Sequence, residues 1–234
     1  MGDRVTEKGQ SLRARQRENL MHAYRARGKR NNNLWLIDSP KTNRDWILPS
    51  DRQLVHWIHY LETDPRVKFF DLVPQSVSGY DGTRERSTEL DAEVTYVDQK
   101  VEWHEVKAGD DVPSTSQLCA QRSAAERARR AHRIFTDRDL SPHIRTSVRW
   151  LKAIGYAAAI RDREHIPSRL ALLSYLMKER AGTVGAIHSE LLGHDPAVTA
   201  GTLVRLTIEG YVSLDLTRTG FGHATPWRCL VAES

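Results

Sequence analysis

The sequence contains little cysteine and no long apolar segment, and both absences narrow the classes of protein to consider. Its two cysteines, Cys119 and Cys229, do not have the spacing of a metal-binding pair. No apolar run approaches the ~20 residues that a membrane-spanning helix needs, and residues 1–19 do not contain the apolar core of a signal peptide. We therefore expect a cytoplasmic protein that forms no disulfide framework and has no membrane partner.

Positive charge is concentrated at the N-terminus. Residues 1–30 carry nine Lys or Arg against three acids, a net charge of +6, although the whole chain has only +5. The remaining 204 residues therefore sum to about −1. A basic arm on a nearly neutral body is a common device for binding nucleic acid or a partner protein. We assign residues 1–33 as such an arm, while a merely solvated terminus remains the alternative.

The periodicity of residues 34–163 predicts an α/β domain. The whole chain, with 39% hydrophobic and 28% charged residues, has the composition of a globular protein. Ser50 is expected to cap a helix over 51–62, in which the apolar residues recur at i, i+3, i+4 and i+7. Strand patterns follow at 66–80, 87–97 and 101–108. A further helix is expected at 117–131, a strand at 132–136 and a last helix at 144–160. This order predicts a mixed sheet flanked by helices, with residues 34–50 wrapping the domain without regular structure.

Residues 164–234 show a different pattern. Polar residues 161–167 mark the boundary, and three short helices and a hairpin are expected at 170–180, 184–192, 195–209 and 211–230. Three helices followed by a hairpin are typical of a winged-helix domain. Its recognition helix would be 195–209, with Thr199, Thr202 and Arg205 on the polar side and Arg218 in the wing. Such domains bind DNA or protein, and the sequence leaves both open.

The stretch 87–108 holds the candidate chemistry. Asp91 lies on one predicted strand, and Glu105 and Lys107 share a face of the next strand, roughly 7 Å apart along it. Two carboxylates suit Mg²⁺, which takes one or two carboxylates together with substrate phosphate and water. The lysine would orient a water or offset charge on a phosphate. The alternative is an ordinary half-exposed antiparallel strand, in which charged and apolar residues also alternate.

Helix 117–131 carries several arginines beside a narrow face of alanines. Arg122 and Arg129 are our candidates for phosphate contacts on this helix. A solvated helix surface explains the same pattern.

The Asp91…Glu105-Val106-Lys107 motif and the αβββαβ order resemble the PD-(D/E)xK nucleases. The layout of residues 45–234 is also similar to TnsA, the endonuclease subunit of heteromeric transposases, which shares the Asp-Pro-Arg-Val of residues 64–67 and the C-terminal winged helix. The resemblance implies an endonuclease that uses Mg²⁺, with Mn²⁺ substituting, to cut DNA at the transposon 5′ ends. It implies an integrase-type transposase and an AAA+ ATPase as partners. Asp91 and Glu105 would bind the metal and Lys107 would assist the attacking water.

The chain departs from the family pattern at two positions. Leu90 replaces the proline before the first acid, and Gln53 stands where the first helix usually carries a glutamate. Asp51 lies on a different face of that helix. Because some relatives have glutamine at the position of Glu105 and glutamate on the helix, this chain is expected to have exchanged the two. A non-catalytic adaptor and a free-standing restriction or repair nuclease remain alternatives.

Overall fold

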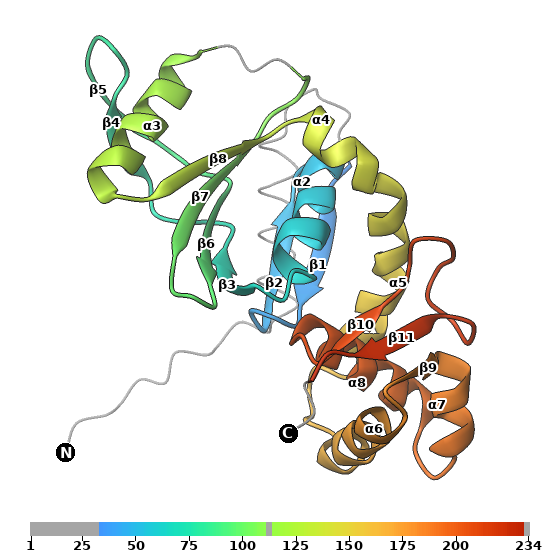
Figure 1. Cartoon of the computed structure of the whole chain (residues 1–234). Helices are drawn as coiled ribbons and strands as arrows, with labels where there is room; N and C mark the ends of the chain where they lie inside the picture. The colour runs from blue at the N-terminus through green and yellow to red at the C-terminus, as the bar shows by residue number, and fades with distance from the viewer. Residues whose placement is uncertain (1–32, 111–113, 232–234) are drawn as a thin grey trace, which may run out of the picture.

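The computed structural model describes residues 33–110 and 114–231 of the chain (Figure 1). The basic arm predicted for residues 1–33 therefore lies outside the described residues, except for Asn33. Within the described ranges, no helix combines the length and the apolar character needed to cross a membrane.

A four-stranded mixed sheet forms the centre of the N-terminal part. The strand order is β3-β6-β7-β8. Strand β6 is antiparallel to both of its neighbours, β3 and β7, whereas β7 and β8 are parallel. The predicted α/β class with a mixed sheet is confirmed. The strands and the helix that connects β7 to β8 are β3 (Val67–Asp71), β6 (Ala92–Tyr96), β7 (Val101–Val106), α3 (Ser116–Ala128) and β8 (Ala131–Phe135).

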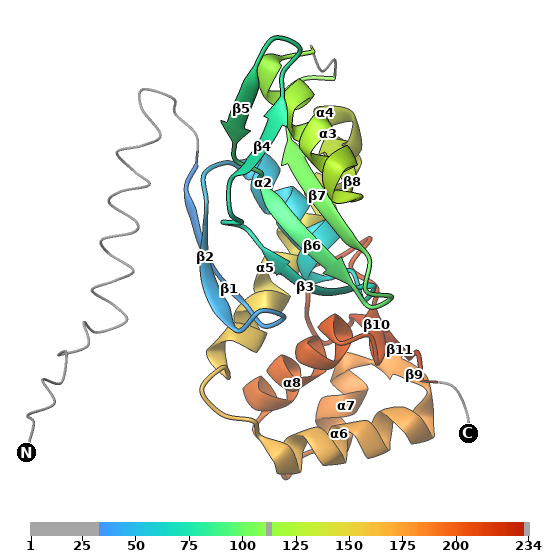
Figure 2. The same ribbon diagram turned by 90° about the vertical axis from the view of Figure 1, so that its left-hand side faces the viewer.

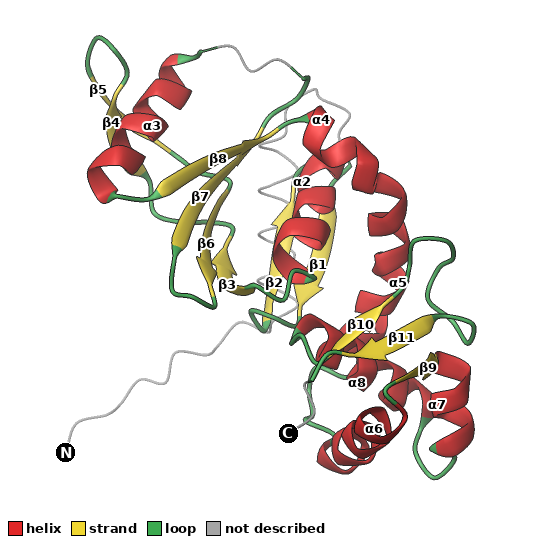
Figure 3. Cartoon of the chain, in the orientation of Figure 1, coloured by secondary structure: helices red, strands yellow, loops and turns green. Residues whose placement is uncertain are grey.

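Helices cover both faces of this sheet (Figure 3). On one face lies α2 (Asp51–His56), which continues as the π-helix η1 (Trp57–Glu62). Ser50 caps it as predicted, since its Oγ accepts from the backbone N of Gln53 at 3.2 Å. His56 contacts Phe135 of β8 with ring centroids 4.5 Å apart. The other face is covered by α3, whose Gln121 bonds to the side chain of Glu105, so alternate residues of β7 meet different helices.

Residues 34–50 correct one expectation, because they form regular structure. Strands β1 (Trp35–Ser39) and β2 (Arg44–Leu48) pair as an antiparallel hairpin, with Ile37 opposite Trp46. Both side chains are buried in the main hydrophobic core. The turn residues that suggested irregular chain are confined to 40–43, between the two strands.

A buried carboxylate attaches this hairpin to the end of the first helix. Glu62 accepts from Ser39 Oγ at 2.6 Å and from the backbone N of Lys41 at 3.0 Å. The Lys41 ammonium donates to the carbonyls of Leu61 and Asp64. Burial raises the pKa of Glu62 to about 7.

The single strand-like run predicted at 66–80 is also wrong in detail, since Pro74 separates two strands. After β3, the chain forms a second hairpin, β4 (Val77–Tyr80) and β5 (Glu85–Thr88), outside the central sheet. This hairpin packs on α3 so closely that a Cβ at Gly79 would lie 1.8 Å from the carbonyl oxygen of Ala120.

The C-terminal part contains the three expected helices and the expected hairpin (Figure 2). A short additional strand, β9, pairs with β11, which makes a three-stranded antiparallel sheet of order β10-β11-β9. The elements are α6 (Ile166–Glu179), β9 (Ala181–Thr183), α7 (Val184–Glu190), α8 (Pro196–Ile208), β10 (Val212–Leu214) and β11 (Pro226–Cys229).

Helix α5 links the two parts. Helix α5 (Ile144–Ala159) follows α4 (Asp137–Leu140) and the 3₁₀ turn η2 (Ser141–His143). It packs along α8. One hydrophobic cluster contains core residues from β1 to β11. The boundary near residue 163 stays a prediction, and the apolar core runs across it.

Helix α8 corrects the expected recognition surface. Thr199 and Thr202, predicted on an exposed polar side, are only 2% and 3% exposed. Burial is tolerated at Thr202 because its hydroxyl donates to the carbonyl of Val198 one turn earlier, at 2.7 Å. The helix is enclosed because it contacts both α5 and α6, so these threonines cannot reach a DNA groove in this arrangement.

The close contact between α5 and α8 predicts that two glycine-to-alanine substitutions change the stability of the fold in opposite directions. A Cβ at Gly201 would lie 2.5 Å from the carbonyl oxygen of Tyr156, whereas a Cβ at Gly155 would meet nothing within 4 Å. We expect Gly201→Ala to lower the free energy of unfolding by about 1–3 kcal/mol through overpacking. Gly155→Ala should raise it by about 0.5–1 kcal/mol through helix propensity. Urea unfolding measures both, and an equal stabilisation by the two variants would contradict this packing.

Candidate active site

The structure brings the three predicted groups of the motif together at one end of the central sheet. Asp91 directly precedes β6, and its Oδ2 accepts from the backbone N of Val106 at 2.7 Å. Glu105 is near the end of β7, and its Oε1 lies 2.5 Å from the Nζ of Lys107. Asp91 and Glu105 both line an open cleft of about 510 Å³.

Gln53 lies against the first carboxylate, where the resemblance expects a residue of the first helix. Its Nε2 donates to Asp91 Oδ1 at 2.9 Å. Its Oε1 is buried and has no hydrogen-bond partner among the described residues. Asp51 is directed elsewhere, since it accepts from Asn33 at 3.0 Å and from the indole of Trp35 at 2.8 Å.

Two glutamines of α3 hold the second carboxylate, and the sequence reasoning missed both. Gln117 Nε2 donates to Glu105 Oε1 at 3.2 Å, and Gln121 Nε2 donates to Glu105 Oε2 at 2.8 Å. The i, i+4 spacing of the glutamines places them on one face of the helix. In the sequence, this spacing next to the alanine face was the signal that could have indicated two polar side chains directed at the sheet.

A third acid of the cleft was also missed. Glu89 lies two residues before Asp91, is exposed and lines the same cleft. Its backbone carbonyl accepts from Gln121 Nε2 at 2.8 Å. Sequence position alone gave no reason to separate it from other loop acids.

Burial and mutual repulsion define the electrostatics of the two carboxylates. Desolvation raises the pKa of Asp91, and the bond from Val106 and the charge of Lys107 oppose this shift only in part. Desolvation also raises the pKa of Glu105, with the Asp91 charge as the next cause. A positive charge placed between the two acids would favour their ionised forms.

Histidines occupy the opposite face of β7, as expected for His104. His104 Nδ1 lies 3.0 Å from Nε2 of the buried His56, and its Nε2 lies 3.3 Å from Glu102. Tyr96 OH donates to the same carboxylate at 2.8 Å. Burial lowers the pKa of both histidines, while the hydrogen bond with His104 lowers the pKa of Glu102. A chain of hydrogen bonds from His56 through His104 to the Glu102 carboxylate therefore fastens α2 to the sheet.

The donor set of the cleft suits a hard cation better than a soft one. Among the residues that the structure describes, no three His, Cys, Asp or Glu side chains are grouped to hold a metal ion. The two carboxylates and the unpartnered amide oxygen of Gln53 are all oxygen donors. Mg²⁺ needs one or two protein carboxylates and takes its other ligands from substrate and water. Asp91, Glu105 and Gln53 therefore fit Mg²⁺.

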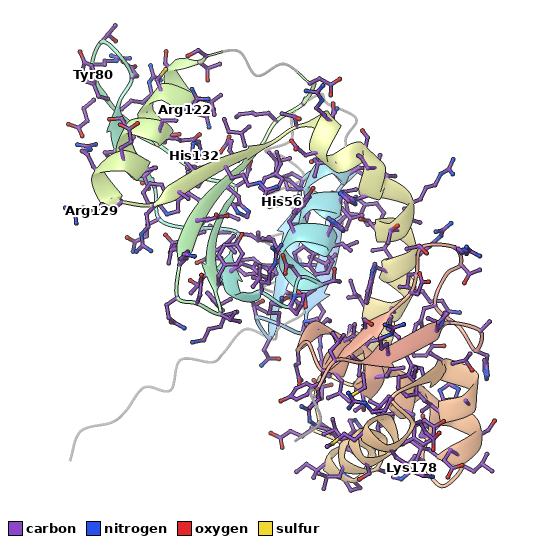
Figure 4. All side chains as sticks on the ribbon, in the orientation of Figure 1. His56, Tyr80, Arg122, Arg129, His132 and Lys178 are labelled. Atoms are coloured by element: carbon purple, nitrogen blue, oxygen red, sulfur yellow. The ribbon has the colours of Figure 1, made fainter. Side chains whose placement is uncertain are left out.

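The candidate phosphate contacts on α3 lie at increasing distance from the cleft. Arg122 and Arg129 are both exposed. Arg122 lies close enough to His132 of β8 to help burial lower the pKa of that imidazole to about 4 (Figure 4). Arg129 ends the helix in a left-handed conformation with φ of 52°, roughly 18 Å beyond Gln117 along the axis.

The two C-terminal candidates are separate from this cleft. Arg205 lines another cleft of about 670 Å³ that shares no residue with the first, and its Nε is buried without a partner among the described residues. Asp38 of β1 is close enough to act on its pKa. Arg218 is exposed in the loop between β10 and β11. Arg205 therefore faces the hairpin β1–β2, and it does not project from an open recognition helix.

Comparison with known proteins adds no relative, because neither a scan of protein-family models nor a search of curated proteins gave a match to this chain.

The raised pKa of Asp91 predicts a pH-dependent gain in stability for Asp91→Asn. A carboxyl with a raised folded-state pKa contributes stability below its ordinary pKa and loses it as the pH rises through the folded value. The asparagine does not ionise, can still accept from Val106, and can donate to Gln53 Oε1 after that amide turns. We expect the variant and the wild type to unfold at similar temperatures near about pH 4, with the variant more stable at neutral pH.

Thermal unfolding without divalent cations measures this difference. Glu93→Gln is the matched control, since Glu93 lies on β6 two residues after Asp91 but bonds to the indole of Trp103 and does not line the cleft. A variant Asp91→Asn that is less stable than wild type at neutral pH would contradict the electrostatic argument.

Proposed function

We propose that this protein is a Mg²⁺-dependent DNA endonuclease that hydrolyses phosphodiester bonds. The observation that carries the proposal is the convergence of Asp91, Glu105 and Gln53 on one open cleft, with Lys107 paired to Glu105. These groups lie at the end of a mixed sheet in which α2, β3, β6, β7, α3 and β8 follow in the αβββαβ order. Mn²⁺ should substitute for Mg²⁺, because it accepts the same oxygen ligands.

The residues of the cleft divide the work of hydrolysis. Asp91 and Glu105 would hold Mg²⁺, which supplies a Lewis acid and lowers the pKa of water. The backbone N of Val106 orients Asp91, while Gln117 and Gln121 orient Glu105. Lys107, at 2.5 Å from Glu105, would orient the attacking water and offset charge on the phosphate.

The amide of Gln53 can serve the site in two orientations. It now donates Nε2 to Asp91, and its buried Oε1 has no partner in the part of the chain that the structure describes. A half-turn about its last side-chain bond exchanges the two atoms, which are nearly equal in shape. The oxygen would then face a cation at Asp91 as a neutral ligand.

We further propose that the enzyme cuts the 5′ ends of a transposon together with an integrase-type transposase and an AAA+ ATPase. This part rests on the resemblance to TnsA. The order helix, strand, helix, helix, strand, strand from α6 to β11, with all three strands in one sheet, supports a winged-helix interpretation. Arg122 would contact DNA phosphates nearer the cleft, Arg129 would do so at the far end of α3, and Arg218 would do so from the wing. Genes for the transposase and the ATPase beside this gene would distinguish the subunit from a free-standing restriction or repair nuclease.

A non-catalytic adaptor is the second candidate, and one feature of the cleft favours it. Lys107 and the two glutamines already satisfy both oxygens of Glu105 without a metal ion. With Gln53 in place of a carboxylate, the cleft can be stable as a scaffold, and binding of DNA or a partner protein would be its function.

Nicking of supercoiled plasmid in Mg²⁺ or Mn²⁺ tests the hydrolase. We expect Asp91→Asn to reduce the nicking rate by more than about 100-fold, because it removes a metal-binding charge. Glu93→Gln also replaces a carboxylate with an amide, two residues away and outside the cleft, and should keep the rate. If wild type and Asp91→Asn are equally inactive, with and without the partner transposase, the adaptor is the better account.

A second test asks which residue of the first helix, Gln53 or Asp51, contributes a ligand to the metal. We expect Gln53→Ala to raise the Mg²⁺ concentration needed for half-maximal nicking, because it removes the amide beside Asp91. Asp51→Asn should have no effect on this requirement, since Asp51 bonds to Asn33 and Trp35. The reverse outcome would mean that Asp51 supplies the helix ligand.

A further inference from the structure

An apolar groove of about 430 Å³ lies on the side of α2 away from the central sheet. Its apolar lining comes from the start of β1, from α2, from α4 and from the first turns of α5, namely Trp35, Leu54, Val55, Leu140, Ile144 and Val148. Ile144 and Val148 are 48% and 58% exposed. They are spaced i, i+4 on α5 and therefore form a continuous uncovered stripe. Large apolar side chains left open in a groove mark a binding surface.

The described chain begins at the edge of this groove. Asn33 is itself one of the residues that line it. The Asn33 amide donates to both carboxylate oxygens of Asp51 at 3.0 Å, and Trp35 Nε1 donates to Asp51 at 2.8 Å. The preceding 32 residues are therefore tethered directly beside the groove.

The composition of this N-terminal segment complements the groove. Leu20, Met21 and Tyr24 are its densest group of large apolar side chains. They stand within fourteen residues of Asn33, and the nine steps from Tyr24 can span up to about 30 Å. The net charge of +6 over residues 1–30 also suits a rim that carries Asp51 and Asp137 against Arg52.

We propose that residues 20–24 bind in this groove of the same chain. Burial of their apolar side chains against Ile144 and Val148 supplies the driving force. The tether raises the effective concentration to the millimolar range, so a weak contact is sufficient. The tethered segment has this advantage over a second copy of the chain or another protein, which would bind from dilute solution.

Photo-crosslinking in the full-length chain tests the proposal. p-Benzoylphenylalanine replaces Tyr24, and mass spectrometry locates the crosslinked peptide. We expect crosslinks within one chain to residues 140–151. Val148→Glu should reduce their yield severalfold because it places a charge in the groove. Val97→Glu is the matched control, since Val97 is also 58% exposed and does not line the groove, and this variant should keep the yield.

A second variant separates loss of the contact from an effect of Val148→Glu on folding. Leu20→Asp changes only the segment and should also reduce the yield. Crosslinks that join two chains, that map outside the groove or that do not form would overturn the proposal, as would an equal loss with Val97→Glu. The experiment requires no DNA, metal or catalysis, so its failure is distinct from failure of the proposed endonuclease.

Discussion

The placement of two carboxylates at the end of the β6–β7 hairpin is the constraint to which the surrounding structure responds. Burial raises the pKa of both acids, and the charge of Asp91 acts on Glu105. Each oxygen is therefore given a donor: Gln53 and Val106 serve Asp91, while Lys107, Gln117 and Gln121 serve Glu105. Within the described part of the chain, Lys107 is the one cationic side chain bonded to the pair. Such groups cost stability and are retained at functional sites.

These donors come from both faces of the sheet, so the cleft depends on how each helix is docked. On one face, the contact of His56 with His104 holds α2, and with it Gln53, against β7. On the other face, the absent side chain of Gly79 allows β4 to approach α3, where a Cβ would collide with Ala120. Residues far from the cleft thus control the position of its amides. The chemistry of the site is inseparable from the packing of the layers.

The sequence predicts the mixed sheet, the helices and the Asp91–Glu105–Lys107 group because periodicity and caps are local signals. It fails where a neighbour decides the environment. The threonines of α8 suggest an exposed side, yet Thr202 satisfies its hydroxyl within the helix and is buried between α5 and α6. Gln117 and Gln121 have the pattern of solvated residues until β7 places Glu105 beside them. The hairpin of residues 35–48 was missed because its short apolar pairs acquire meaning only when Ile37 faces Trp46.

The neutral residue on the first helix sets the balance between a stable fold and a reactive cleft. A glutamate at position 53 would add a third carboxylate to two that are already difficult to ionise. Gln53 instead donates to Asp91 and stabilises its charge in the folded chain without a cation. Among the described residues, the Oε1 of Gln53 has no hydrogen-bond partner. The amide therefore stabilises the Asp91 carboxylate without adding a further negative charge, which makes the burial of the two acids less costly to the fold. Glu105 carries the second negative charge of the cleft, and α3 supplies the glutamines that make its burial tolerable.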